Sequence, residues 1–184
     1  MACKKNTAEA LKCYTEAAQL GIVEAEFSLG RLHEQGIDLV KDTDKAIQHY
    51  KNAEAKGLIS AKFKRLELEA ALKNDSAAQF HLGKCYLSGE GVKKDVLQGV
   101  QQLLLAADNK YGPAKKLLQD NSSIIYDLAR DFSEGRSKTK NPILARKLYE
   151  IVEKYGNEFD KPAAEEELAA MPVEIAASIY SHSS

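Results

Sequence analysis

Apolar residues recur at helical spacing in the stretch that best defines the organisation of the chain. Ala78, Leu82 and Tyr86 follow one another at intervals of four residues, so they form one ridge of a helix. Gly83 lies beside this ridge, where the missing side chain lets another helix approach closely. Glycine costs about 1 kcal/mol of helix propensity relative to alanine, which favours a packing reason for its presence. The pattern predicts a helix that packs tightly against a neighbour.

A turn and a second helix follow this first helix. Gly89 and Gly91 suit the positive φ angles that end a helix and reverse the chain. Asp95 stands where an N-cap is expected, before a helix that carries Gly99 and Leu103. The stretch therefore predicts a helical hairpin with small residues at defined positions.

The hairpin pattern occurs more than once along the chain. An offset of 53 residues relates residues 25–42 to residues 78–95, and a further offset of 46 reaches residues 128–141. An alanine, tyrosine, alanine, glycine pattern at residues 10–21 lies 36 residues before the same pattern at residues 46–57. Self-similarity at such periods is typical of stacked repeat arrays, in which each repeat packs on its neighbours.

These repeated residues resemble a known family. Residues 78–95 read A-x-F-x-L-G-x-x-Y-x-x-G-x-G-V-x-x-D, and residues 46–57 read A-x-x-x-Y-x-x-A-x-x-x-G. This pattern is similar to the Sel-one-like repeat (SLR), a relative of the tetratricopeptide repeat. The earlier copy departs from it, because His33 replaces the first-helix tyrosine and Asp38 replaces the second turn glycine.

The resemblance implies an all-α fold, a right-handed α-α superhelix (solenoid) of antiparallel helix pairs. We expect a single domain over residues 1–184. Its expected parts, in chain order, are a second-helix half (7–21), a repeat (25–57), a degenerate insert (61–76), a repeat (78–112), a short insert (114–122), a repeat (124–156) and a C-terminal cap (161–180).

Composition and charge narrow the classes of function. Hydrophobic residues make up 44% of the 184 residues and charged residues 29%, as in ordinary soluble proteins. The net charge of -1 gives no electrostatic reason to expect a nucleic acid as partner. No apolar run approaches the ~20 residues of a membrane span, so membrane insertion is not expected. With no secretory signal behind Met1 and only three cysteines, we expect a cytoplasmic protein, or an exported one if it is a bacterial effector.

Catalytic and metal-binding motifs are absent from the sequence. There is no phosphate-binding loop, no H-E-x-x-H, no C-x-x-C and no G-x-S-x-G, so no catalytic residue, metal ligand or cofactor is assigned. His81 and Cys85 lie four residues apart, which places an imidazole near a thiol on one helix face. We interpret the pair as a histidine beside a small buried thiol, because two side chains do not make a zinc site.

One set of polar residues recurs at equivalent positions in the first helix of each of the three predicted repeats. In an array these positions line up as stripes on one surface. The resemblance implies that first helices line the concave face, so the stripes would lie in a groove. A basic stripe with polar neighbours suits an acidic peptide or the carboxylates of a partner protein. The residues are Arg31, Lys84 and Arg130, with Ser28, His81 and Asp127 three positions earlier.

Two classes of function follow from these observations. The first is a non-enzymatic scaffold or adaptor that binds another protein or peptide in the concave groove of the array. The resemblance also leaves open an SLR-type enzyme, such as a β-lactam-binding hydrolase with His81 and Cys85 at its centre, and a bacterial effector or immunity-type binding protein. The sequence does not identify the partner.

Overall fold

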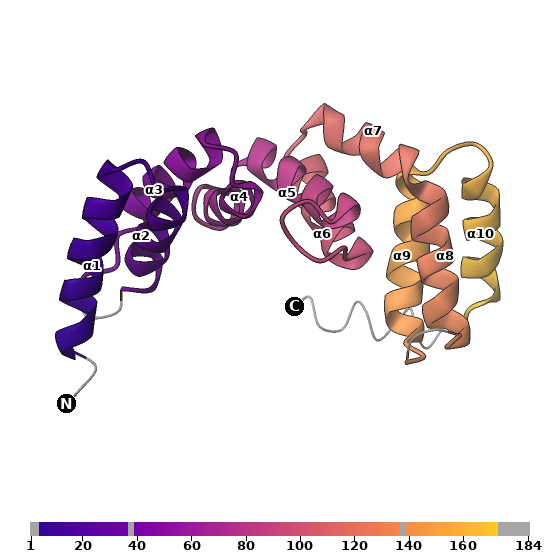
Figure 1. The fold of residues 1–184 in the computed structure, drawn as a ribbon. Helices are drawn as coiled ribbons and strands as arrows, with labels where there is room; N and C mark the ends of the chain where they lie inside the picture. Colours follow the sequence, from indigo (N-terminus) through magenta and orange to yellow (C-terminus); the bar gives the residue numbers. More distant parts are fainter. Residues whose placement is uncertain (1–3, 37–38, 137–138, 173–184) are drawn as a thin grey trace. The chain divides into compact units, whose positions relative to one another are not determined.

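The computed structural model describes residues 4–36, 39–136 and 139–172 (Figure 1). Within them every regular element is an α-helix, which confirms the predicted all-α fold class. The helices are α1 (Lys4–Gln19), α2 (Val23–Gln35), α3 (Thr43–Ala55), α4 (Ile59–Lys73), α5 (Ser76–Ser88), α6 (Val96–Asp108), α7 (Gly112–Asp120), α8 (Ser122–Glu134), α9 (Pro142–Tyr155) and α10 (Asp160–Ala170).

The helices form two compact units. Helices α1 to α5 belong to the first unit, Met1–Asp95, and α6 to α10 belong to the second, Val96–Ser184. In the first unit each helix packs on the next one along the chain. In the second unit α8, α9 and α10 lie side by side (Figure 1). The continuity of one array across residue 95, which a single domain requires, stays a prediction. The expected cap (161–180) overlaps α10, and its part beyond residue 172 lies outside the described residues.

The three first helices end in the same way. Each of α2, α5 and α8 is followed by a left-handed glycine, and these are Gly36, Gly89 and Gly135, with φ of 66°, 80° and 74°. The turn after each glycine is closed by a backbone hydrogen bond across nine residues. The three bonds run from Asp42 to His33 (3.0 Å), from Asp95 to Tyr86 (2.9 Å) and from Asn141 to Phe132 (2.8 Å), with the first residue of each pair donating. The repeat register derived from the sequence is therefore also the register of the turns.

Two of the residues equivalent to Asp95 in the repeat pattern, Asp42 and Asn141, form capping hydrogen bonds at the start of their helices. The Asp42 side chain accepts a hydrogen bond from the backbone N–H of Lys45 at 2.9 Å. Asn141 accepts one from Leu144 at 3.0 Å, and Pro142 follows it at the first turn of α9. These bonds satisfy backbone N–H groups that have no partner inside the helix.

Close approach of α2 and α3 depends on a helical glycine. A Cβ atom on Gly30 would lie 2.6 Å from the ring of Tyr50, which is completely buried. Phe27 packs on the same ring, with the two ring centroids 5.3 Å apart. The small residue therefore makes room for a large aromatic one, as the sequence pattern suggests for such positions.

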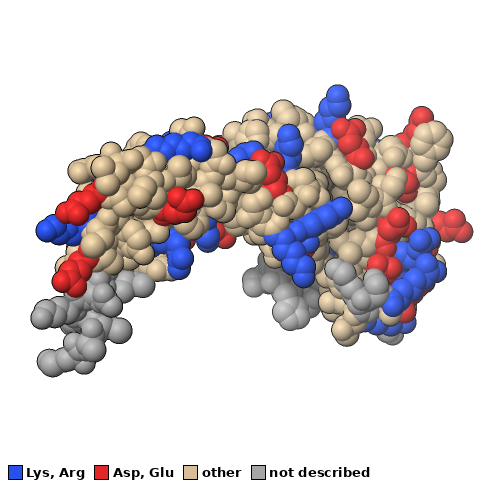
Figure 2. All heavy atoms as spheres, in the orientation of Figure 1, with Lys and Arg blue, Asp and Glu red and all other residues tan. Residues whose placement is uncertain are grey.

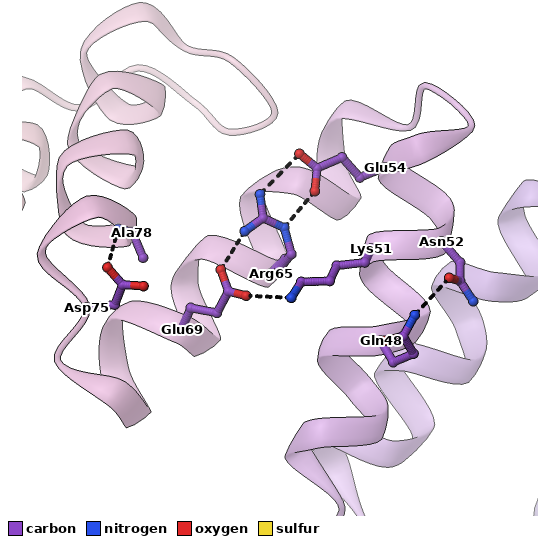
Figure 3. Close-up of polar contacts among 8 residues, drawn as sticks. All are labelled: Gln48, Lys51, Asn52, Glu54, Arg65, Glu69, Asp75 and Ala78. Carbon is purple, nitrogen blue, oxygen red and sulfur yellow. Dashed lines mark hydrogen bonds and ion pairs between the residues drawn. The ribbon is translucent and has the colours of Figure 1, made fainter.

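The stretch expected as a degenerate insert forms a full helix, α4, between α3 and α5. Arg65 on α4 donates two hydrogen bonds to Glu54 of α3, at 2.6 and 3.1 Å, and another to Glu69 (Figure 3). Lys51 of α3 approaches the same Glu69 at 3.3 Å. On the side facing α5, a core cluster joins Phe63, Leu66 and Ala70 to Ala78, Leu82 and Cys85.

A polar network fixes α10 on α8 in the second unit. The Ser122 hydroxyl donates to the Asp160 carboxylate at 2.5 Å, and the Asn157 amide donates to the same carboxylate at 2.7 Å. The Asn157 side-chain oxygen accepts a hydrogen bond from the backbone of Asp160 at 2.8 Å, so it also caps α10. The start of the C-terminal helix is thus held by side chains from two helices and their connection.

The close contact at Gly30 gives a first prediction. Gly30→Ala should lower the free energy of unfolding by about 1–3 kcal/mol, because the added methyl group overlaps the fully buried ring of Tyr50. Gly112→Ala is the control, since a Cβ at that position meets no atom within 4 Å, and its effect should stay within about 0.5 kcal/mol. Chemical denaturation followed by circular dichroism measures both, and equal losses would contradict the packing role.

Candidate partner-binding surface

Ser28 and Arg31 line a small hollow between α1 and α2 in the first unit. The hollow has a volume of about 160 Å³, and its other lining residues are Tyr14, Leu32 and Gln35. The four lining residues of α2 follow the i, i+3, i+4, i+7 spacing of a single helix face, and this face is opposed by one residue of α1. The hollow therefore combines a cation, hydroxyl and amide groups and the apolar part of an aromatic ring.

The guanidinium group of Arg31 is available to a ligand. Its side chain is exposed and forms no ion pair with any of the described residues, and none of the residues that line the hollow is acidic. The Ser28 hydroxyl donates a hydrogen bond to the backbone oxygen of Glu24 at 2.8 Å, which leaves its oxygen lone pairs as acceptors. Because guanidinium groups bind carboxylates through two parallel hydrogen bonds, this position suits an acidic group.

His81 and Lys84 are both exposed on α5, in the same unit. The Lys84 ammonium lies 5.8 Å from the centroid of the Phe80 ring, within range of a weak cation–π contact. Burial lowers the pKa of His81, and the neighbouring charge of Lys84 lowers it further. At neutral pH this pair therefore presents one positive charge and a largely neutral imidazole.

Asp127 and Arg130 on α8, in the second unit, pair with each other. Their carboxylate and guanidinium groups are 3.0 Å apart, and the two side chains are 66% and 38% exposed. The pair carries no net charge, so it offers less attraction to an acidic partner than Arg31 or Lys84 does. Equivalent positions in the sequence pattern thus carry different electrostatics.

The structure separates His81 from Cys85 in environment. Cys85 is 1% exposed and packs in the core cluster with Phe63 and Leu66, whereas His81 is exposed. Burial raises the pKa of the Cys85 thiol, which disfavours the reactive thiolate. The interpretation of the pair as a histidine beside a buried thiol agrees with this geometry.

Neither a metal centre nor a membrane span is found among the residues that the structure describes. Within these residues no three or more His, Cys, Asp or Glu side chains gather closely enough to hold a metal ion. None of the helices in the described ranges is both long and apolar enough to cross a membrane.

Tyr14, Leu32 and Gln35 line the hollow but are not among the site residues predicted from the sequence. Of these, Tyr14 occupies the repeat position equivalent to Tyr50, at an offset of 36 residues. Tyr14 is 38% exposed and Tyr50 is fully buried, so the same residue type has a structural role in one repeat and an accessible surface in the other.

The family comparison identifies the repeats directly. A family model described as Sel1 repeat matches residues 1–22, 23–58, 76–111 and 125–151, which together make up more than half of the chain. The two gaps between matched segments, residues 59–75 and 112–124, contain α4 and α7. No curated protein sequence matches the chain.

Two solved structures are similar to the chain. A crystal structure of a Sel1 repeat protein from Oxalobacter formigenes is 25% identical and covers 83% of this chain, with a TM-score of 0.37. A crystal structure of c5321, a protective antigen present in uropathogenic Escherichia coli strains displaying an SLR fold, is 24% identical and covers 91% of this chain, with a TM-score of 0.33. The chain spans 66% of the first protein and 38% of the second.

The equivalent tyrosines give a second prediction. The Tyr50 hydroxyl donates to the Glu34 carboxylate at 2.5 Å, whereas the buried Tyr149 hydroxyl has no hydrogen-bond partner among the described residues. Ser133 stands at the position of Glu34 in that later repeat. Tyr50→Phe should therefore cost about 1–2 kcal/mol of unfolding free energy, because it leaves a partly buried carboxylate without its donor.

Tyr149→Phe is the matched control and should cost less than about 0.5 kcal/mol or be stabilising, because it removes a buried group that has no partner among the described residues. Urea denaturation of both variants measures the difference. A larger loss for Tyr149→Phe would show that its hydroxyl has a partner of comparable strength.

Proposed function

The chain belongs to the Sel1 repeat family, and we propose that it is a non-enzymatic adaptor that binds another protein through the exposed positions of its first helices. Sel1 repeats generally mediate protein–protein interaction. For this chain the finer proposal assigns the contact to the first unit, with Arg31 and Ser28 on α2 and Lys84 and His81 on α5 as the contacting residues.

The observation that carries the proposal is Arg31, which has no ion-pair partner among the described residues, at the hollow between α1 and α2. Most charged side chains on a protein surface either pair with a neighbouring charge or extend into water. Neither arrangement requires the side chain to line a hollow. Here a cation, a tyrosine and a leucine line the same depression, which suits an acidic side chain next to an apolar one.

The electrostatic attraction of an acidic partner would come from a few local charges rather than from the net charge of the whole chain. The net charge is -1, and the face drawn in Figure 2 carries acidic and basic side chains interspersed with uncharged surface. A partner is therefore expected to be recognised by the placement of a few carboxylates. Asp127 and Arg130 contribute less to this recognition, because they neutralise each other.

The hydrolase alternative gains no support from the best candidate nucleophile. Such an enzyme needs a reactive side chain that a substrate can reach. Cys85 is buried in the core and its pKa is raised, so it is a poor nucleophile in this fold. An effector or immunity-type protein remains compatible with the proposal, since it would also act by binding.

Charge reversal tests the proposal. The double variant Arg31→Glu, Lys84→Glu should weaken binding to a partner recovered by affinity purification about tenfold or more, because two favourable contacts become repulsive. Binding of the purified partner to the full chain is measured by isothermal titration calorimetry.

The control is Lys115→Glu, Lys116→Glu, which makes the same change in net charge at two exposed residues of α7. This variant should bind the partner as the unchanged chain does. If both double variants lose affinity equally, the effect is one of overall charge; if neither does, the first-helix surface is not the binding site.

A further inference from the structure

Two histidine rings stack at the contact between α2 and α3 in the first unit. The rings of His33 on α2 and His49 on α3 have centroids 5.5 Å apart and planes inclined by only 8°. Both side chains are partly buried. Neutral imidazole rings can stack in this way, whereas two protonated rings would place like charges face to face. The contact made by this histidine pair therefore depends on protonation.

The two rings differ in their hydrogen bonds. His49 Nδ1 lies 2.8 Å from the Glu26 carboxylate of α2, and because an ionised carboxylate only accepts, this nitrogen carries the hydrogen. His33 Nδ1 is buried and has no hydrogen-bond partner among the described residues. A positive charge on His49 therefore faces a carboxylate, whereas a positive charge on His33 lacks an acceptor at this nitrogen.

The charges around His33 oppose its protonation. Burial lowers the pKa of His33 most, and the neighbouring His49 and Lys45 lower it further, while Asp42 acts in the opposite direction. Asp42 is itself engaged by Lys45, whose ammonium lies 3.1 Å from the carboxylate. No described group of α1, which also packs on α2, contributes to the pKa of His33. The charged groups of α4 that reach α2 and α3 are already paired, and these pairs are Arg65–Glu54, Glu69–Lys51 and Lys64–Glu34.

The later repeats do not place histidines at these two positions. Tyr86 and Phe132 stand at the position of His33, and Gln102 and Leu148 stand at the position of His49. The position of Glu26 is also occupied by uncharged residues in the later repeats. The helical framework therefore does not need a histidine pair, and the sensitivity to protonation is particular to the α2–α3 contact.

We propose that the histidine pair is a pH-sensitive contact, which packs α2 on α3 while both rings are neutral and weakens this packing in mild acid. Because folding lowers the pKa of His33, the folded chain binds fewer protons than the unfolded chain near the usual histidine value. The stabilisation is therefore complete above about pH 6.5 and is lost as the pH falls below it. Helix α2 also carries Arg31, so the affinity for a partner falls with the packing, and this last step alone rests on the proposed adaptor function.

NMR titration of the histidine rings in the full chain tests the pair directly. The pKa of His33 should lie below the usual histidine value of about 6.5. His49→Gln keeps a donor for Glu26 but removes the titrating neighbour, so the pKa of His33 should rise in this variant. His81→Gln is the control, because it removes a histidine of α5 that is not part of the pair, and it should leave the pKa of His33 unchanged.

Urea denaturation at about pH 7.5 and about pH 5.5 measures the effect on stability. The variant is His33→Phe, which introduces the residue that stands at this position in the third repeat. Between the two pH values, the urea midpoint of the unchanged chain should fall by about 0.5 M more than the midpoint of His33→Phe. Subtracting the variant removes the contribution of every other titrating group.

Three results would overturn the inference. The first is a pKa of His33 at or above its usual value, which would indicate an acceptor such as Asp38, a residue that lies outside the described ranges. The second is a pKa of His33 that His49→Gln leaves unchanged, and the third is an equal fall of the urea midpoint in the unchanged chain and in His33→Phe.

Partner binding separates this inference from the proposed function. Calorimetry at the same two pH values should show affinity that weakens in acid for the unchanged chain and weakens less for His33→Phe. If the NMR and urea results hold while the affinity does not depend on Arg31, the pH-sensitive contact stands and the proposed binding surface does not.

Discussion

Burial of a second-helix tyrosine against a small residue of the preceding first helix is the contact on which the first unit depends. Tyr50 is fully buried because Gly30 has no side chain and Phe27 packs on the ring. A helix of this kind cannot bury its apolar face alone, so each one needs a neighbour. Tyr14, at the equivalent position of α1, is 38% exposed.

Equivalent positions in a repeat keep their place in the fold but not their chemistry. Arg31 has no ion-pair partner among the described residues, Lys84 lies over an aromatic ring, and Arg130 is paired with Asp127. The backbone positions are fixed by helix packing, whereas the charges depend on which side chains happen to be within about 4 Å. The charge presented at this repeat position therefore varies along the chain while the helical framework repeats.

Helix α4 shows how a weakly patterned stretch can be a full part of the structure. Its sequence lacks the glycines and the turn of an SLR hairpin, so the repeat pattern indicates only a degenerate insert over residues 61–76. In the structure it packs on both α3 and α5, and Arg65 binds Glu54 and Glu69 across the first of these contacts. Packing of α4 on α3 and α5, and its partly buried charge network, require only that the surface of α4 is complementary to these two helices. The repeat motif does not specify the residues of that surface.

The sequence by itself determined the helices, their stops at Gly36, Gly89 and Gly135, their caps at Asp42 and Asn141, and membership of a helical repeat family. These features depend on neighbouring residues along the chain, so spacing and residue type are sufficient to predict them. Only the tertiary structure decided that Tyr50 is buried whereas Tyr14, the same residue type at an equivalent position, is accessible. Burial and ion pairing are set by residues distant in the sequence, because what covers a side chain comes from another helix whose position the local pattern does not contain.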